Sequence, residues 1–154
     1  MASLTYGDEV QQPPPPRPAS VLFVCAMNAI RSPMAEHLAR SLYRNRIYAR
    51  SAGVTAGGDP DAFAMAVMAE RGIDISSHMP QTLDELGDGF FDLIVTLSPE
   101  AHHRALQLSR AQAVDVEYWP TMDPSTVAGK REQVLDAYRQ TRDRLEERIR
   151  KRFG

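Results

Sequence analysis

A thiol and a guanidinium stand six positions apart near the start of the chain, at Cys25 and Arg31. A cysteine thiolate is a strong nucleophile. An arginine can meet two phosphate oxygens with parallel hydrogen bonds, which a lysine cannot do. Because arginine is common in this chain, the spacing alone is weak evidence, and the neighbouring elements must support a phosphate site.

The residues around this pair indicate a strand, a loop and a helix. Residues 21–24 read VLFV, an apolar run that is typical of a central parallel strand. Apolar residues then recur at helical spacing, and we expect Ser32 to be the N-cap with Pro33 at the first helical position. Residues 25–31 are therefore predicted to form a loop at the carboxyl end of a strand, where ligands bind in open α/β sheets.

Such a loop can bind a phosphoryl group. A helix N-terminus presents free amide donors and a partial positive charge, which bind phosphate and favour thiolate over thiol. We therefore expect Cys25 to attack a phosphorus atom held by the loop. The expected substrate-binding residues are Ala26, Met27, Asn28, Ala29, Ile30, Arg31 and Ser32.

The rest of the chain alternates between short apolar runs and longer amphipathic segments. Further strands are predicted at residues 47–52, 91–97 and 114–119, and helices at 60–70, 98–108 and from about 129. This order predicts one α/β domain over residues 20–154, with a four-stranded parallel sheet and helices on both faces. Residues 1–19, with prolines at 13–16, are predicted to be a disordered proline-rich tail.

Composition restricts the functional classes. The chain has 154 residues, a net charge of −2 and one cysteine, which cannot form an internal disulfide. The charge gives no general basic field, so we expect no nucleic-acid partner. The N-terminus lacks a secretory pattern and no apolar run approaches membrane-spanning length, so we expect a cytoplasmic protein with no membrane partner.

The run VLFVCAMNAIRSPMAEHLAR resembles the low-molecular-weight protein tyrosine phosphatases, and also the related thioredoxin-coupled arsenate reductases that share their fold. Further segments are similar to that family in the same order, over about residues 20–150. They are Arg50-Ser51-Ala52-Gly53, Gly72-Ile73-Asp74-Ile75 with His78, Phe91-Asp92-Leu93-Ile94-Val95, and Asp123-Pro124.

The resemblance implies a role for each matching residue. Cys25 would become a phosphocysteine, and Asp123 would protonate the leaving oxygen and later activate water. Asn28 would brace the loop, and Ser32 would donate a hydrogen bond to the sulfur. The implied substrate is a phosphorylated protein or a small phosphomonoester, hydrolysed without a metal or cofactor.

Three positions depart from the family pattern. Met27 replaces a common glycine, so the loop is expected to be slightly strained. Ile30 replaces a second cysteine, which removes protection by an internal disulfide. Ser125 and Thr126 stand where many of these phosphatases have tyrosines, which puts a preference for phosphotyrosine in doubt.

Two other functions remain open. An arsenate reductase would use the same loop but would need an external thiol, because this chain has no further cysteine. A phosphate- or phosphopeptide-binding module would keep the loop without turnover. Asp123-Pro124 could also be only a turn. His78 is expected to pin a loop rather than bind metal, and His102 and His103 are expected to be solvated.

Overall fold

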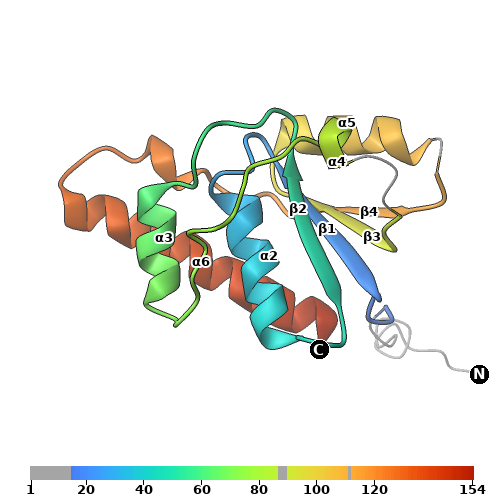
Figure 1. Cartoon of the computed structure of the whole chain (residues 1–154), viewed down its shortest axis with the longest axis horizontal. Coiled ribbons are helices and arrows are strands. Elements are labelled where there is room, and N and C mark those ends of the chain that lie inside the picture. Colours follow the sequence, from blue (N-terminus) through green and yellow to red (C-terminus); the bar gives the residue numbers. More distant parts are fainter. Residues whose placement is uncertain (1–14, 87–89, 111) are drawn as a thin grey trace, which may run out of the picture.

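Four parallel strands form one sheet in the order β2-β1-β3-β4 (Figure 1). The computed structural model describes residues 15–86, 90–110 and 112–154. The strands are β1 (Ser20–Cys25), β2 (Tyr48–Gly53), β3 (Leu93–Thr96) and β4 (Asp115–Tyr118). β1 pairs with β2 on one side and with β3 on the other, so it is a central strand, as its apolar run predicts.

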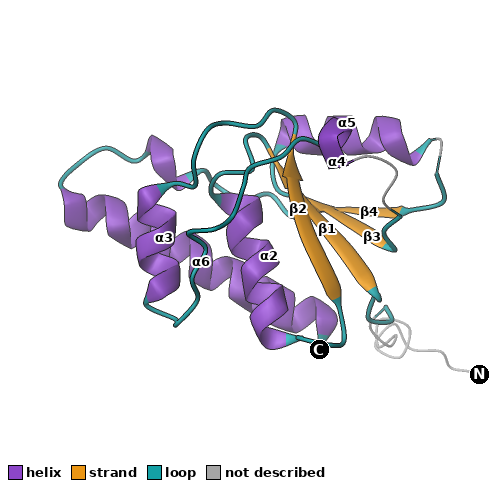
Figure 2. Cartoon of the chain, in the orientation of Figure 1, coloured by secondary structure: helices purple, strands orange, loops and turns teal. Residues whose placement is uncertain are grey.

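Helices cover both faces of this sheet (Figure 2). One face carries α2 (Arg31–Leu42), α3 (Ala62–Ala69) and the long α6 (Arg131–Phe153), and the other carries the short α4 (Leu83–Leu86) and α5 (Pro99–Ser109). Successive residues of β1 point to opposite faces, so Phe23 packs in the core beneath α2 and α6 while Leu22 packs in the core beneath α5. The predicted α/β architecture is confirmed.

The start of α2 differs from the prediction. The helix begins at Arg31, and Ile30 occupies the cap position without a side-chain capping bond. Pro33 lies in the first turn, where its missing N–H has no helical partner to lose. Ser32 is not the N-cap: its side chain is fully buried and its hydroxyl lies beside the Cys25 sulfur. The Ser32 hydroxyl therefore contacts the Cys25 sulfur and does not cap the helix.

Other predicted elements lie close to their expected positions. Ser98 caps α5 by accepting a hydrogen bond from the amide of Ala101 at 3.2 Å. α6 begins two residues after Gly129, and its buried stripe includes Leu135 and Tyr138. β3 and β4 are shorter than the predicted runs 91–97 and 114–119, whereas β1 is longer than the predicted run 21–24 and β2 is shifted by one residue from 47–52.

The predicted N-terminal tail is only partly described. Residues 1–14 lie outside the described residues. Residues 15–19 lead into β1, and the Arg17 guanidinium donates to the carbonyl oxygen of Phe153 at 2.9 Å. Within the described residues, no helix is both long enough and apolar enough to span a membrane.

Candidate active site

Cys25 ends β1 and opens a tight loop, residues 25–31, called here the phosphate loop. The Cys25 sulfur accepts a hydrogen bond from the amide of Asn28 at 3.2 Å and lies 2.9 Å from the hydroxyl oxygen of Ser32. Both neighbours can donate to a thiolate. The first turn of α2 follows directly, so its free amides face the same end of the sheet.

Asn28 holds the conformation of this loop. Its φ of 57° lies in the left-handed region, which asparagine tolerates better than most residues. Its side-chain amide donates to the hydroxyls of Ser32 and Ser51, each at 2.9 Å, and its side-chain oxygen accepts from the amide of Gln81 at 2.9 Å. Because every polar atom of this buried side chain is bonded, Asn28 joins the loop to β2 and to the segment before α4.

The unusual backbone angle falls on Asn28 and not on Met27. Among the described residues, Asn28 is the one non-glycine residue with a positive φ. The expected strain at Met27 is therefore wrong. Gly53 is the residue at which two backbone segments pack closely. A Cβ added there would lie 2.8 Å from the Asn28 amide nitrogen and 2.3 Å from the Thr55 carbonyl oxygen. The glycine at the end of β2 lets the loop fold against that strand.

The structure brings Cys25, Arg31 and Asp123 to the wall of one pocket of about 130 Å³. Asp123 reaches it from the loop after β4, where its Oδ1 accepts from the amide of Ser125 at 2.9 Å and from the Ser125 hydroxyl at 2.7 Å. No hydrogen bond to Oδ2 occurs among the described residues, so this oxygen is free to face a ligand. The pocket therefore combines a thiol, a guanidinium and a carboxyl group.

The predicted binding residues divide into two groups. Met27, Ala29, Ile30 and Arg31 line the pocket together with Ser125. Ala26, Asn28 and Ser32 do not line it: the Ala26 carbonyl accepts from the amide of Thr55 at 2.9 Å, and the side chains of Asn28 and Ser32 are fully buried behind the loop.

A buried polar network behind the loop includes residues that sequence reasoning missed. The Ser51 hydroxyl donates to the carboxylate of Glu36, whose other oxygen lies 3.0 Å from the Arg40 guanidinium. Glu36 is only 4% exposed. Glu36 stands two residues from both Met34 and Leu38, off the main apolar stripe of the predicted helix, so its position gave no signal of its burial. Side-chain hydrogen bonds therefore connect Cys25 to Glu36 without a break, through Ser32, Asn28 and Ser51.

His78 supports the same loop, as the sequence predicted. Its Nε2 lies 3.3 Å from the Asn28 carbonyl oxygen and 3.2 Å from the Asn28 side-chain oxygen. Burial lowers the pKa of His78 below its ordinary value, although the Glu36 carboxylate opposes the shift. Burial also lowers the pKa of the neighbouring His37.

The expectation for the histidine pair on α5 is half wrong. His103 is exposed, as predicted. His102 is partly buried: its Nδ1 lies 3.0 Å from the Thr96 hydroxyl, and its ring stacks on Tyr118 with centroids 4.7 Å apart. Helical geometry correctly predicts that the two rings point in different directions. The packing of α5 against β3 and β4, which partly buries His102, could not be predicted from the sequence.

These features define a class of protein: an α/β domain in which a loop that begins with a cysteine joins a parallel strand to a helix. Residues 20–153 match the family described as low molecular weight phosphotyrosine protein phosphatase. The chain belongs to this family. The family fold is shared by tyrosine phosphatases and arsenate reductases, and both occur among the similar proteins.

The similar proteins carry different activities. The arsenate reductase of Bacillus licheniformis is 32% identical over 88% of this chain and 94% of its own length. The low molecular weight protein tyrosine phosphatase of T. tengcongensis is 28% identical, with a TM-score of 0.70 over 86% of this chain and 95% of that chain. A YwlE arginine phosphatase mutant with a phosphorylated active-site serine is 29% identical, with a TM-score of 0.69 over 85% of this chain and 91% of that chain.

Proposed function

We propose that this protein hydrolyses phosphomonoesters, with phosphotyrosine in proteins as the main substrate class, through a phosphocysteine at Cys25. The observation that carries the proposal is that Cys25, Arg31 and Asp123 line the same pocket. A nucleophile, an anion-binding group and a proton donor are the three parts that phosphate-ester cleavage needs.

In the first step the Cys25 thiolate attacks phosphorus while the phosphoryl oxygens are held by Arg31 and the loop amides. The sulfur–phosphorus bond forms as the ester phosphorus–oxygen bond breaks. Asp123, in its protonated form, gives its proton to the departing oxygen, which would otherwise leave as a basic alkoxide or phenoxide. The free Oδ2 of Asp123 is suited to this, because Ser125 already occupies Oδ1.

In the second step a water molecule attacks the phosphocysteine. The Asp123 carboxylate takes the proton of that water, the sulfur–phosphorus bond breaks, and inorganic phosphate forms. The Ser32 hydroxyl, 2.9 Å from the sulfur, donates a hydrogen bond to the leaving thiolate. The Asn28 side-chain amide donates to Ser32 at 2.9 Å, so the hydroxyl proton can go to the sulfur or to the Ala52 carbonyl oxygen, which lies 3.3 Å away.

The residues in the pocket wall influence which phosphorylated side chain can bind. Met27 is 48% exposed and lines the pocket with Ile30, so the side chain of a phosphorylated residue would meet a thioether and an aliphatic group. Ser125 also lines the pocket. A methionine can pack on an aromatic ring through its sulfur, which supports phosphotyrosine without tyrosines in the wall.

The proposal is tested by turnover of an aryl phosphate, an alkyl phosphate, phosphoarginine and a phosphotyrosine peptide by the full chain. We expect phosphate release without added metal or thiol, fastest with the phosphotyrosine peptide, and a phosphocysteine trapped by rapid acid quench. Tight phosphate binding with no release from any substrate would instead identify a binding module.

A second candidate is arsenate reduction, favoured by the names of the curated relatives, of which one is 32% identical over 88% of this chain. Arsenate could occupy the same loop, because its geometry resembles that of phosphate. The chain contains one cysteine, so an arsenic adduct at Cys25 would need an external thiol to release arsenite. Arsenite production that depends on added glutathione, mycothiol or a redoxin, with negligible phosphate release, would favour this candidate.

A further inference from the structure

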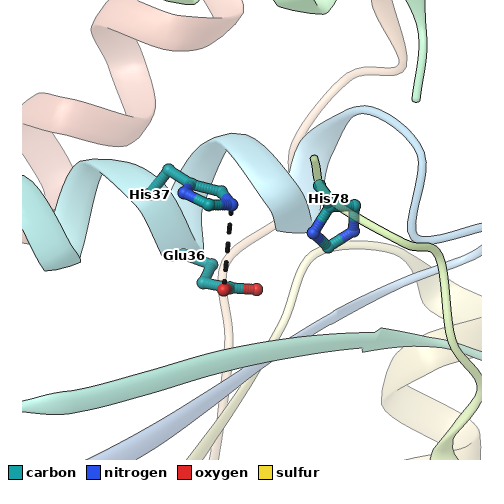
Figure 3. Close-up of side chains that lie close together, drawn as sticks. All are labelled: Glu36, His37 and His78. Atoms are coloured by element: carbon teal, nitrogen blue, oxygen red, sulfur yellow. Dashed lines mark ion pairs between the residues drawn. The ribbon is translucent and has the colours of Figure 1, made fainter. Parts of the chain in front are cut away.

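Three side chains that each carry an atom able to bind a metal, Glu36, His37 and His78, lie close together behind the phosphate loop (Figure 3). Each offers one ligand atom, and the three atoms lie within 4.8 Å of one another. They line a pocket of about 270 Å³, separate from the pocket of Cys25. We propose that this cluster binds one divalent transition-metal ion, of the class represented by Zn²⁺, outside the catalytic pocket.

His37 gives the first argument, because its Nε2 has no hydrogen-bond partner among the described residues. Among the described residues, this nitrogen is the one buried side-chain nitrogen or oxygen without a hydrogen bond. It lies 3.8 Å from Oε2 of Glu36, and the His37 side chain is only 16% exposed. A buried polar atom without a partner is costly. Coordination of a metal by the neutral ring would satisfy this nitrogen.

His78 is already oriented as a metal ligand. Its Nε2 faces two oxygens of Asn28, at 3.3 and 3.2 Å, and the side-chain oxygen also accepts from the Gln81 amide. Two acceptors require that Nε2 carries a proton, so the lone pair of the neutral ring is on Nδ1. Figure 3 shows one ring nitrogen of His78 turned toward Glu36 and His37. Metal-binding histidines usually donate their other N–H to a carbonyl in this way.

Glu36 supplies the charge. One of its carboxylate oxygens accepts from Ser51, and the other lies 3.0 Å from the Arg40 guanidinium. Two imidazoles and one carboxylate form a common ligand set for zinc, with a fourth position left for water. Because zinc bonds are about 2.0–2.2 Å long, binding requires the three side chains to move together.

Two cations compete with a metal at this site. Arg40 and Arg50 line the same pocket, and Arg40 pairs with the carboxylate oxygen that the metal needs. The Arg40 side chain is 45% exposed and its Nε also donates to the Ala49 carbonyl oxygen at 3.1 Å, while Arg50 donates to the Tyr48 hydroxyl at 2.9 Å. Removing the Arg40 charge must therefore strengthen metal binding, whereas removing a ligand must weaken it.

The test uses the full chain with Cys25→Ser, so that zinc cannot bind the thiolate. Calorimetric titration with ZnCl₂ is expected to show one site, and Co²⁺ is expected to give the visible absorption of a tetrahedral ion. His37→Ala in the same background should weaken binding more than about tenfold. Arg40→Gln should tighten it about two- to fivefold, the factor that a partly exposed ion pair supplies. His103→Ala, an exposed histidine on α5, is the matched control and should change nothing.

Thermal melting gives a second measurement on the same variants. Zinc should raise the melting temperature of the Cys25→Ser chain and of its His103→Ala variant, because a ligand that binds the folded state stabilises it. It should not raise that of His37→Ala. Equal zinc affinity with and without His37, weaker binding by Arg40→Gln, or no saturable binding would each overturn the proposal. Because no readout involves turnover, failure here leaves the proposed hydrolase activity untouched.

Discussion

Arg31 donates a hydrogen bond from Nη1 to the carbonyl oxygen of Thr121 at 2.9 Å, two residues before Asp123. The amide of Thr121 in turn donates to the carbonyl oxygen of Leu97, after β3, at 3.1 Å. Arg31 as a whole is only 9% exposed. The arginine of the phosphate loop is thus tied to the loop that carries Asp123, and its orientation is fixed before any anion binds.

Arg31→Lys should lower kcat/KM by about two orders of magnitude, or about 2.7 kcal/mol of transition-state stabilisation. A lysine can neither form two parallel hydrogen bonds to a phosphoryl group nor also reach Thr121. Steady-state kinetics with an aryl phosphate measures the loss. Arg44→Lys, an exposed change at the end of α2, is the control. A rate near that of the native chain would show that Arg31 only begins a helix.

Cys25→Ser should abolish phosphate release while phosphate still binds. The loop amides and Arg31 remain, but the hydroxyl is a far weaker nucleophile than a thiolate at neutral pH. Calorimetric titration with inorganic phosphate and a phosphate-release assay on one sample make the comparison. Appreciable turnover by this variant would remove Cys25 from the mechanism.

Asp123→Asn should harm alkyl phosphates much more than activated aryl phosphates. General acid assistance is typically worth about 10²–10⁴-fold, and it matters most when the leaving group is basic. Single-turnover phosphorylation of Cys25 isolates the first step from the slower hydrolysis that the variant also causes. Asp115→Asn, an exposed change on β4, is the control. An equal loss for both substrates would show that Asp123 is not the general acid and that Asp123-Pro124 only forms a turn.

Asn28→Ala should destabilise the protein by about 2–4 kcal/mol, because it removes buried hydrogen bonds and leaves a positive φ on alanine. Activity should fall further than stability explains, since the Asn28 side chain holds the hydroxyl of Ser32. Urea unfolding and kcat/KM at a temperature where the variant is folded separate the two effects. Asn45→Ala, in the exposed turn after α2, should change neither quantity.

Stability should fall as the pH is lowered below neutrality. Burial holds the pKa values of His37 and His78 below their ordinary value of 6.5. The unfolded chain therefore binds protons first as the pH drops through 6.5, which favours unfolding. The contribution of these neutral rings to the free energy of unfolding is complete above pH 6.5. It is lost as the pH falls from 6.5 through the pKa values that the two histidines have in the folded protein.

Urea unfolding in a metal chelator at pH 7.5 and pH 5.5 measures this dependence. His37→Gln should reduce the difference in unfolding free energy between the two pH values, while His103→Gln should leave it unchanged. If the difference is the same in all three proteins, protonation of His37 does not contribute to the acid sensitivity.

The sequence by itself determined the α/β order and the position of the phosphate loop. An apolar run such as residues 21–24 can only be buried on both sides, which predicts a central parallel strand. A cysteine and an arginine on the following turn then meet at the carboxyl end of that strand, because local geometry alone brings them together. Asp123 lies 98 positions from Cys25, and only the resemblance to a known family suggested that the two share a site.

The tertiary structure decided what the polar groups around the loop do. Ser32 has the sequence signal of a helix cap, yet its hydroxyl lies at the Cys25 sulfur, because Asn28 turns into the core and bonds it there. Glu36 and His37 are adjacent in sequence and give no signal for a shared site with His78. They meet because the segment that carries His78 packs beside α2, where the His37 and His78 ring centroids lie 5.8 Å apart. Such long-range contacts depend on the packing of whole elements rather than on local sequence.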